Sequence, residues 1–190
     1  MSSILPWIVL LLPLVSAFTI ILATRPLRNA SALISVAAVF GSFLGSVLIF
    51  FRETAAAPAI SWISLGSYFS IPLGLTLDPL SRSMLFMVTG VGALIHLYSL
   101  GYMGADEGKS RYFACLSLFM FSMLGIVLAN NFVMMFIFWE LVGISSYLLI
   151  GHWFERTAAA EAARKHSLPL ALATSVSCSA FSWSGARPVR

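Results

Sequence analysis

Charged side chains are scarce in this sequence. Lysine and arginine together number 11 and aspartate and glutamate 7, so charged residues make up 9% of the 190 residues. A globular domain of ordinary composition has about 25%. So few charges cannot cover the surface of a water-soluble protein, whereas 59% hydrophobic residues and a mean hydropathy of +0.95 suit a chain surrounded by lipid. The composition therefore predicts an integral membrane protein.

Cysteine is also rare, and the common signatures of a reactive site are missing. The two cysteines, Cys115 and Cys178, form neither a disulfide framework nor a zinc spacing. The sequence has no glycine-rich phosphate loop, no nucleophile paired with a base and no cluster of metal ligands. We therefore expect no cofactor or metal in this chain. The net charge of +4 comes from basic residues scattered over short loops, which excludes a nucleic-acid patch.

The sequence is rich in long apolar runs. Five runs are long enough to cross about 30 Å of hydrocarbon at about 1.5 Å per residue. The first is expected to stay as a span, because Met1–Trp7 lacks the basic segment of a cleaved signal peptide. The sequence thus predicts an all-α membrane bundle with spans at Ile4–Ala23, Ala32–Phe51, Leu80–Leu100, Tyr112–Ala129 and Phe132–Ile150.

Basic residues in the linkers predict the orientation of these spans. Seven lie after the first, third and fifth spans and two on the alternate side, so the N-terminus is expected outside and the end of the fifth span in the cytoplasm. Lys109 and Arg111 are expected to face solvent beside Asp106 and Glu107. The seven are Arg25, Arg28, Lys109, Arg111, Arg156, Arg164 and Lys165, and the two are Arg52 and Arg82.

The outer linker between the second and third spans has β character. Apolar residues alternate with small or polar ones over residues 69–77, a period of two that is typical of a half-buried strand, and Ile60–Leu65 is β-prone as well. With a turn between them, these segments predict a small β-hairpin on the outer face. Asp78 and Pro79 then predict the start of the third span, with Asp78 as its N-cap.

Glu140 is the most informative residue. It is ninth of nineteen in the fifth run, near the bilayer midplane, and no other acidic residue lies deep inside a run. A charged side chain there costs about 2.5–3.5 kcal/mol on insertion scales, and intramembrane carboxylates are usually functional. Such a group can load and release a proton or form half of an ion pair. The alternative is a neutral carboxylic acid that is hydrogen-bonded to a neighbouring helix.

The histidines give a weaker signal. His96 lies about one turn from the cytoplasmic end of the third span and could relay protons, because its side chain titrates near neutral pH. It could equally cap or bridge helices near the interface. His152 follows the fifth span beside Trp153, where anchoring at the interface is the favoured interpretation.

Three blocks of sequence resemble a known family. They are Val88–Tyr102, Glu107–Phe113 and Phe138–Gly151, the last with Phe-Trp-Glu-Leu-Val-Gly around Glu140. They resemble the L-type subunit (chain 5) of NADH:quinone oxidoreductase, respiratory complex I. The resemblance implies an antiporter-like, proton-translocating subunit in which Glu140 matches the family's essential glutamate. Family members often carry Asp where Asn130 stands, and the midplane lysines that relay protons lie on later helices that this chain lacks.

The resemblance also suggests an interpretation of the C-terminal residues, 166–190. His166–Arg190 is rich in serine and lacks helical periodicity. One permitted codon choice for His166–Gly185, with one base added in front, reads as an apolar segment that contains Thr-Arg-Val-Gly-Asp, a block similar to the family's next segment. We therefore expect residues 1–165 to form the membrane domain and residues 166–190 to be an out-of-frame, disordered tail. DNA that continues past codon 165 in another frame would confirm it.

The hypothesis for function follows from the resemblance. The chain is expected to be the N-terminal part of a multi-pass inner-membrane subunit of complex I, inactive alone, whose partners are the other membrane subunits and the lipid bilayer. Sites for NADH, flavin, iron–sulfur clusters and quinone would belong to partner subunits. The nearest rival is the large subunit of a multi-subunit Na⁺/H⁺ antiporter or of a membrane-bound hydrogenase. A rival of another class is a membrane anchor or assembly protein that transports nothing.

Overall fold

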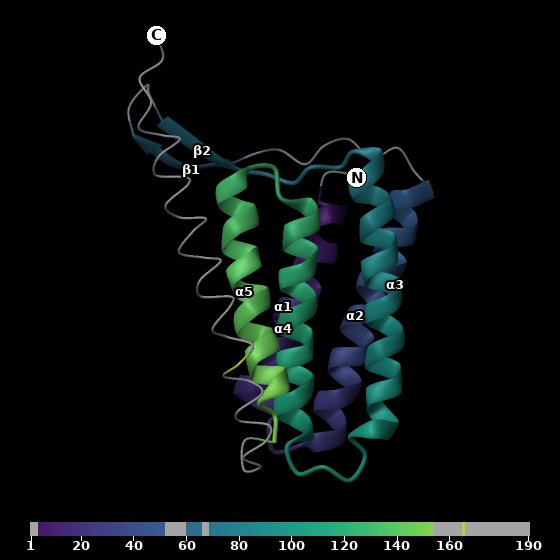
Figure 1. Ribbon diagram of the computed structural model, residues 1–190. Helices are drawn as coiled ribbons and strands as arrows, with labels where there is room; N and C mark the ends of the chain where they lie inside the picture. Colours follow the sequence, from purple (N-terminus) through teal and green to yellow (C-terminus); the bar gives the residue numbers. More distant parts are fainter. Residues whose placement is uncertain (1–3, 52–59, 66–68, 154–164, 166–190) are drawn as a thin grey trace. The chain divides into compact units, whose positions relative to one another are not determined.

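The computed structural model describes residues 4–51, 60–65, 69–153 and 165 (Figure 1). The chain divides into two compact units, Met1–Val142 and Gly143–Arg190, and the boundary falls inside the last helix. The predicted tail after residue 165 lies outside the described residues.

Among the described residues, the fold consists mainly of five long helices, as the apolar runs predict. Each is long and apolar enough to cross a membrane. Helix α1 passes directly into a π-helical turn, η1, at its C-terminal end. The elements are α1 (Leu5–Thr19), η1 (Ile20–Thr24), α2 (Arg28–Phe51), β1 (Ile60–Leu65), β2 (Phe69–Leu73), α3 (Pro79–Tyr102), α4 (Lys109–Leu128) and α5 (Phe132–Ile150).

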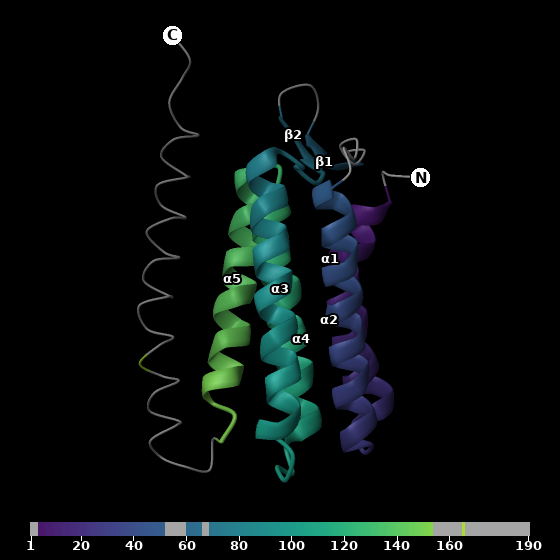
Figure 2. The ribbon, with the colours of Figure 1, turned by 90° about the vertical axis from the view of Figure 1, so that its right-hand side faces the viewer.

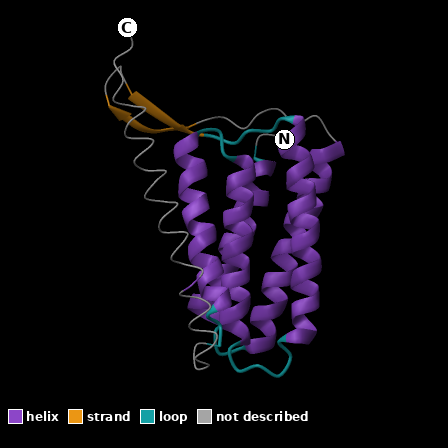
Figure 3. Cartoon of the chain, viewed as in Figure 1, coloured by secondary structure: helices purple, strands orange, loops and turns teal. Residues whose placement is uncertain are grey.

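Helices α1 to α4 form the body of the first unit. They run up and down in turn, with the α1–α2 and α3–α4 connections at one end and the α4–α5 turn at the other (Figures 1 and 3). An apolar core joins α1, α2, α3 and α4 near the end where α1 begins, and a second cluster around Met103 and Phe113 fills the opposite end. The first cluster contains Val9, Leu10, Ile49, Leu75, Leu77, Leu85, Leu124, Leu128 and Met134.

The predicted β-hairpin is present. Strands β1 and β2 pair antiparallel, with a register irregularity between Ser61 and Ile63, and they lie at the end of the bundle where α1 begins (Figure 2). The alternation continues beyond β2, since Leu75 and Leu77 are buried in the core. Leu75 also forms an isolated bridge with Ala129, so the chain after the hairpin is tied to the end of α4.

The start of α3 confirms the predicted cap. The Asp78 carboxylate accepts a hydrogen bond of 2.6 Å from the Ser81 amide, and Pro79 occupies the first helical position. Hydrogen bonds from Ser81 lower the pKa of the Asp78 carboxyl from its ordinary value of 3.8.

The helices at the other end extend further than the apolar runs predict. Helix α2 begins at Arg28 rather than Ala32, and α4 at Lys109 rather than Tyr112. Lys109 was expected in solvent, and that prediction is wrong. Its side chain is buried, and its Nζ donates to the Asn29 side-chain oxygen at 3.1 Å. The alkyl stem lies in the apolar end of the bundle while the ammonium group keeps a polar partner.

Candidate functional site

Helix α5 carries the principal candidate, Glu140. No side of α5 is polar, because its residues are almost all aliphatic, aromatic or methionine. A helix that is apolar all round belongs inside a large protein or a membrane. Glu140 lies ninth of its nineteen residues and is partly buried. The structure thus places a carboxyl group about 12 Å from one end of an apolar helix and about 15 Å from the other.

The first turn of α5 is fixed by Asn131. Its side-chain oxygen accepts from the Met134 amide at 2.8 Å, which caps the helix. Its side-chain nitrogen donates to the Pro72 carbonyl at 2.7 Å and to the Asn130 side chain at the same distance. One amide therefore joins the start of α5 to the end of the β-hairpin.

A glycine on α4 sets how closely α5 approaches. The Phe138 ring lies so near Gly125 that an added Cβ would collide with three of its ring atoms, including Cγ. The same ring meets Phe121 edge-on, with centroids 5.2 Å apart. Because Phe138 is two residues before Glu140, this contact positions the helix segment that carries the carboxyl group. Nothing in the sequence pattern marks Gly125 for this role.

His96 on α3 is fully buried. Its Nδ1 lies 2.8 Å from the Gly92 carbonyl oxygen. A carbonyl oxygen can only accept, so Nδ1 carries the hydrogen, and in the neutral imidazole Nε2 holds a lone pair. Among the described residues, Nε2 has no hydrogen-bond partner. The structure therefore leaves a buried proton-accepting atom inside the bundle.

Hydroxyl-bearing residues occur on α3 and on the helices that pack against it near His96. Its ring lies 6.4 Å from the Phe113 ring, and the Phe113 carbonyl accepts from Ser35 on α2 at 3.4 Å. Ser99, one turn along α3, lies 3.3 Å from the Tyr112 hydroxyl. Hydroxyl-bearing side chains thus lie beside the apolar cluster in the half of the bundle near the α3–α4 connection.

The two candidates approach α4 at different levels. His96 meets α4 near Phe113, whereas the segment before Glu140 meets it at Phe121 and Gly125. The eight residues from Phe113 to Phe121 correspond to about 12 Å along the helix axis. The structure therefore brings both candidates to one helix but not to one point.

Small and hydroxyl-bearing residues hold α1 to α4 together. On α2 the buried serines recur at positions that share one face. Ser42 donates to the Val9 carbonyl on α1 at 3.0 Å, and Ser46 lies 2.6 Å from the Thr89 hydroxyl on α3. The serines on this face are Ser31, Ser35, Ser42 and Ser46. Their spacing of four, seven and four could have been recognised in the sequence.

Glycines on α2 and α3 allow neighbouring helices to approach closely. A Cβ on Gly41 would lie 2.7 Å from Leu12, and one on Gly45 would lie 2.5 Å from Val9. On α3, Gly90 faces Phe43, and the Met120 side chain lies directly over Gly92. Such close contacts are typical of membrane helices.

Two sequence profiles of known families match the chain. One, described as NADH-Ubiquinone oxidoreductase (complex I), chain 5 N-terminus, covers residues 62–113. The other, described as NADH:quinone oxidoreductase/Mrp antiporter, TM, covers residues 129–183. The second match runs past Lys165, and the boundary placed there stays a prediction.

Similar proteins carry related names. NAD(P)H-quinone oxidoreductase subunit 5, chloroplastic, of Zygnema circumcarinatum is 42% identical over 170 residues, which cover 84% of this chain and 24% of that protein. NAD(P)H-quinone oxidoreductase chain 5 of Synechocystis sp. is 40% identical over 172 residues, which cover 85% and 25%. The chain therefore spans about a quarter of the length of these relatives.

Solved structures share the fold. A chain of the Mrp complex from Dietzia sp. DQ12-45-1b has a TM-score of 0.63 and 28% identity, over 76% of this chain and 16% of that one. A chain of the membrane-bound sulfane sulfur reductase, an archaeal respiratory membrane complex, has a TM-score of 0.75 and covers 90% of this chain and 34% of that one. At 19% identity, the second shows likeness of fold alone. The two profiles, the relatives and the Mrp chain together show that the chain belongs to the family of the antiporter-like membrane subunit, chain 5, of NADH:quinone oxidoreductase.

Proposed function

We propose that this chain acts in a proton-translocating membrane subunit of an NAD(P)H:quinone oxidoreductase, and that Glu140 is the group that loads and releases the proton. The observation that carries the proposal is Glu140, the one acidic residue of α5, in the middle of that helix. The chain is also 40–42% identical to two proteins named as NAD(P)H-quinone oxidoreductase subunits. The family membership supports proton translocation as the activity. The position of Glu140 supports this residue as the group that carries the proton.

The energetics of Glu140 suit a proton carrier. At mid-span the charged carboxylate is disfavoured by about 2.5–3.5 kcal/mol, or by more when lipid surrounds it. In the proposed cycle, a change in the hydration or charge around the group drives the uptake and release of its proton. Redox chemistry elsewhere in the assembly would supply that change, because this chain has no cofactor signature of its own.

His96 is the proposed relay in the half of the bundle near the α3–α4 connection. The lone pair on its Nε2 can accept a proton while Nδ1 keeps its hydrogen bond to Gly92. The hydroxyl groups of Ser99 and Tyr112, at 3.3 Å from each other, lie between this depth and the membrane surface. Hydroxyl groups both donate and accept, so they can pass protons when water joins them.

The proposed partners are the other membrane subunits and a peripheral redox arm that holds the NAD(P)H and quinone sites. The proposed location is the inner membrane of the cell, with the N-terminus outside. The clustering of Arg25, Arg28 and Arg111 with Lys109 at one end of the bundle supports this orientation.

The test of Glu140 measures proton pumping against electron transfer. The changes Glu140→Gln, Glu140→Asp and Glu140→Ala are made in the gene of the producing cell, and dye quenching and NADH oxidation are followed in inverted membrane vesicles. We expect Gln and Ala to abolish most of the proton gradient formed per NADH, and Asp to retain part of it. Glu107→Gln is the matched control, because this carboxylate is 90% exposed in the α3–α4 connection.

The outcome separates the proposal from its rivals. Wild-type pumping by Glu140→Gln shows that titration of this group is not required. Loss of the subunit from the membrane, measured by immunoblot, identifies a role in folding instead. Unchanged pumping by every Glu140 variant, with normal assembly, favours a membrane anchor that transports nothing.

His96 is tested with a substitution that keeps its structural contact. In His96→Asn the side-chain amide can still donate to the Gly92 carbonyl from the place of Nδ1, while the proton-accepting Nε2 is lost. We expect normal assembly and reduced pumping. His96→Asn vesicles that pump at the wild-type rate would assign His96 to helix packing.

A second candidate function is monovalent cation/proton antiport. The 28% identity to a chain of the Mrp complex favours it. A Na⁺ gradient that drives proton movement in vesicles without NADH, and that depends on Glu140, would establish antiport. Proton movement that requires NADH and not Na⁺ excludes it.

A further inference from the structure

Lys109 is a buried basic residue at the end of the bundle where α4 begins. It is the first residue of α4, and its relative exposure is 7%. Its Nζ donates to the Asn29 side-chain oxygen, a neutral partner, at 3.1 Å. The next residue, Ser110, is buried as well, and its hydroxyl has no hydrogen-bond partner among the described residues. An ammonium group and a hydroxyl group are thus enclosed at this end of the bundle.

The neighbouring carboxylates are bound to other groups. The Asp106 carboxylate accepts from the Gly108 amide at 2.6 Å. The Glu107 carboxylate pairs with Arg28 at 3.6 Å in an exposed position. Among the described residues, Lys109 forms no ion pair with a carboxylate. Its ammonium group can therefore exchange a proton without breaking an ion pair.

We infer that Lys109 takes protons from the cytoplasmic surface and passes them to His96. The inference rests on the proposed function and on the orientation proposed with it. Polar groups lead inward from Lys109. Tyr112 follows it by three residues and shares its side of α4, and the Tyr112 hydroxyl lies 3.3 Å from the Ser99 hydroxyl on α3. Ser99 in turn follows His96 by three residues and lies about one turn from it.

The distance between Lys109 and His96 is short. Phe113, whose ring lies 6.4 Å from the His96 ring, is four residues after Lys109, or about 6 Å along α4. A lysine carries its amine on a flexible four-carbon stem. The amine can therefore turn from Asn29 toward Tyr112 without movement of the backbone.

The transfer breaks and forms bonds to hydrogen only. Nζ of Lys109 releases a proton to a water molecule beside the Tyr112 hydroxyl, and each hydroxyl group on the way accepts one hydrogen and donates its own. The Nε2 lone pair of His96 takes up the last hydrogen. Cytoplasmic water then returns a proton to the neutral amine. Each cycle moves one proton from the cytoplasm to His96 and leaves Lys109 as it began.

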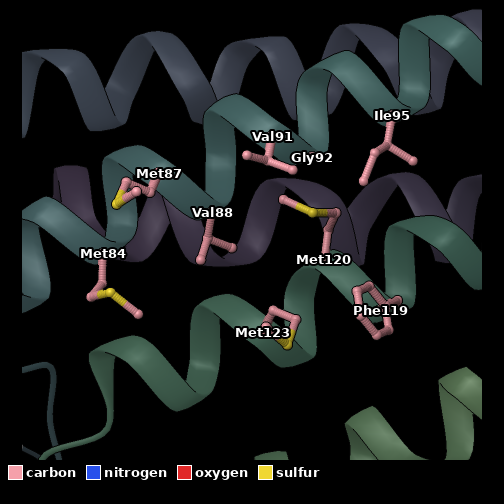
Figure 4. A pocket seen from close by; sticks show the side chains of 9 residues that line it. All are labelled: Met84, Met87, Val88, Val91, Gly92, Ile95, Phe119, Met120 and Met123. Carbon is pink, nitrogen blue, oxygen red and sulfur yellow. The ribbon is translucent and has the colours of Figure 1, made fainter.

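An apolar groove between α3 and α4 offers protons no second route. Its volume is about 330 Å³. Figure 4 shows the residues that line it, six from α3 and three from α4. All nine are apolar, and four of them are methionines. Because these side chains give a proton no strong acceptor, the polar groups between Lys109 and His96 carry it instead.

Few other groups at this end can titrate in place of Lys109. Helix α1 and η1 carry no charged or titratable side chain. Arginine does not titrate in proteins, which leaves aside Arg25, Arg28 and Arg111. The other titratable groups at this end, among the described residues, are Asp106 and Glu107 in the connection, Tyr98 and Tyr102 on α3, and Tyr112 and Cys115 on α4.

Substitutions at Lys109 test the inference. They are made in the gene of the producing cell, and the proton gradient per NADH is measured in inverted vesicles, whose outer face is the cytoplasmic one. Lys109→Arg keeps the charge and a donor for Asn29 but cannot release a proton, and Lys109→Gln keeps a donor without a charge. We expect both to lose pumping several-fold per assembled complex. Lys109→His should retain part of it, and its pumping should decline at a lower pH than in the wild type, because an imidazole loses its proton at a lower pH than an amine.

The control is Arg28→Gln, which removes a cation from the same end of the bundle. The Arg28 side chain is 53% exposed, and the change should leave pumping as in the wild type. Wild-type pumping by Lys109→Arg or Lys109→Gln overturns the inference. So does loss of the subunit from the membrane in all three Lys109 variants, measured by immunoblot, because it assigns Lys109 to folding.

Glu140→Gln, measured in the same vesicles, separates this inference from the proposed function. If Glu140→Gln loses pumping while Lys109→Arg pumps normally, the proposed function stands and Lys109 is not the entry of its protons. If Lys109→Arg loses pumping while Glu140→Gln pumps normally, the role of Glu140 is wrong and the entry at Lys109 stands.

Discussion

The contact between Gly125 and Phe138 gives the sharpest prediction about stability. In Gly125→Ala, the added Cβ meets Cγ, Cδ1 and Cε1 of the Phe138 ring. Rotation of the ring about its own axis cannot move Cγ, so either α5 shifts or Phe138 leaves its rotamer. Overpacking of this kind costs about 1–3 kcal/mol.

Helix propensity acts in the opposite direction. Alanine is favoured over glycine in a helix by about 1 kcal/mol, so the net destabilisation of Gly125→Ala is at most about 2 kcal/mol. Gly101 provides a control, because no heavy atom of the described residues, apart from its chain neighbours and the backbone of its own helix, lies within 4 Å of the place its Cβ would take. Gly101→Ala gains the same propensity without the collision. The two variants should therefore differ in free energy of unfolding by about 1–3 kcal/mol.

The measurement is reversible unfolding in mixed detergent micelles, followed by circular dichroism. Phe138→Leu removes the ring, so the double variant of Gly125→Ala with Phe138→Leu should recover stability relative to the sum of the single changes, with a coupling of about 0.5–3 kcal/mol. Equal unfolding energies for Gly125→Ala and Gly101→Ala would refute the reasoning. So would strict additivity of the changes at Gly125 and Phe138.

Three further predictions concern other parts of the bundle. A double-mutant cycle at Ser46 and Thr89, whose hydroxyls are 2.6 Å apart, should give a coupling of about 0.6 kcal/mol. The coupling is small because each hydroxyl has one hydrogen and also lies within hydrogen-bonding distance of a carbonyl of its own helix. Because the pKa of Asp78 is lowered on folding, its carboxylate stabilises the folded state above pH 3.8, the ordinary pKa, and this stabilisation is lost as the pH falls through the lowered pKa. Asp78→Asn should remove this pH dependence from acid unfolding while the side-chain oxygen still caps the helix. In Glu107→Cys, the cysteine should react with a membrane-impermeant maleimide only after permeabilisation. Labelling in intact cells would show that the orientation is the opposite of the predicted one.

The elements that sequence patterns predicted well are local ones. Hydrophobic runs set all five spans because only a helix satisfies its backbone within one segment in lipid. The Asp78 cap and the paired strands of the hairpin depend on neighbouring residues, and both are found. The end of α5 at Ile150 agrees with the apolar run, whereas α2 and α4 begin earlier because polar residues continue a helix at the membrane surface.

The features that the sequence did not reveal depend on pairs far apart in the chain. The partner of Lys109, Asn29, lies 80 residues away, and nothing local to Lys109 distinguishes it from a solvated lysine. The role of Gly125 is visible only when Phe138 is placed beside it. His96 differs, because its bond to Gly92 is local, but only the packed helices show that Nε2 has no hydrogen-bond partner among the described residues.

Helix α4 is held at both ends, and this has a mechanical consequence. Lys109, its first residue, binds Asn29 on α2, and the Leu128 carbonyl accepts from the Thr76 amide at 2.9 Å, while Asn131 joins the following turn to Pro72. A rod pinned at both ends can bow sideways but cannot slide along its axis. Between these ends, the Phe121 ring and the Gly125 backbone of α4 contact the Phe138 ring of α5. Under the proposed function, a change of charge at Glu140 would therefore bend α4 sideways and would not displace it along its axis.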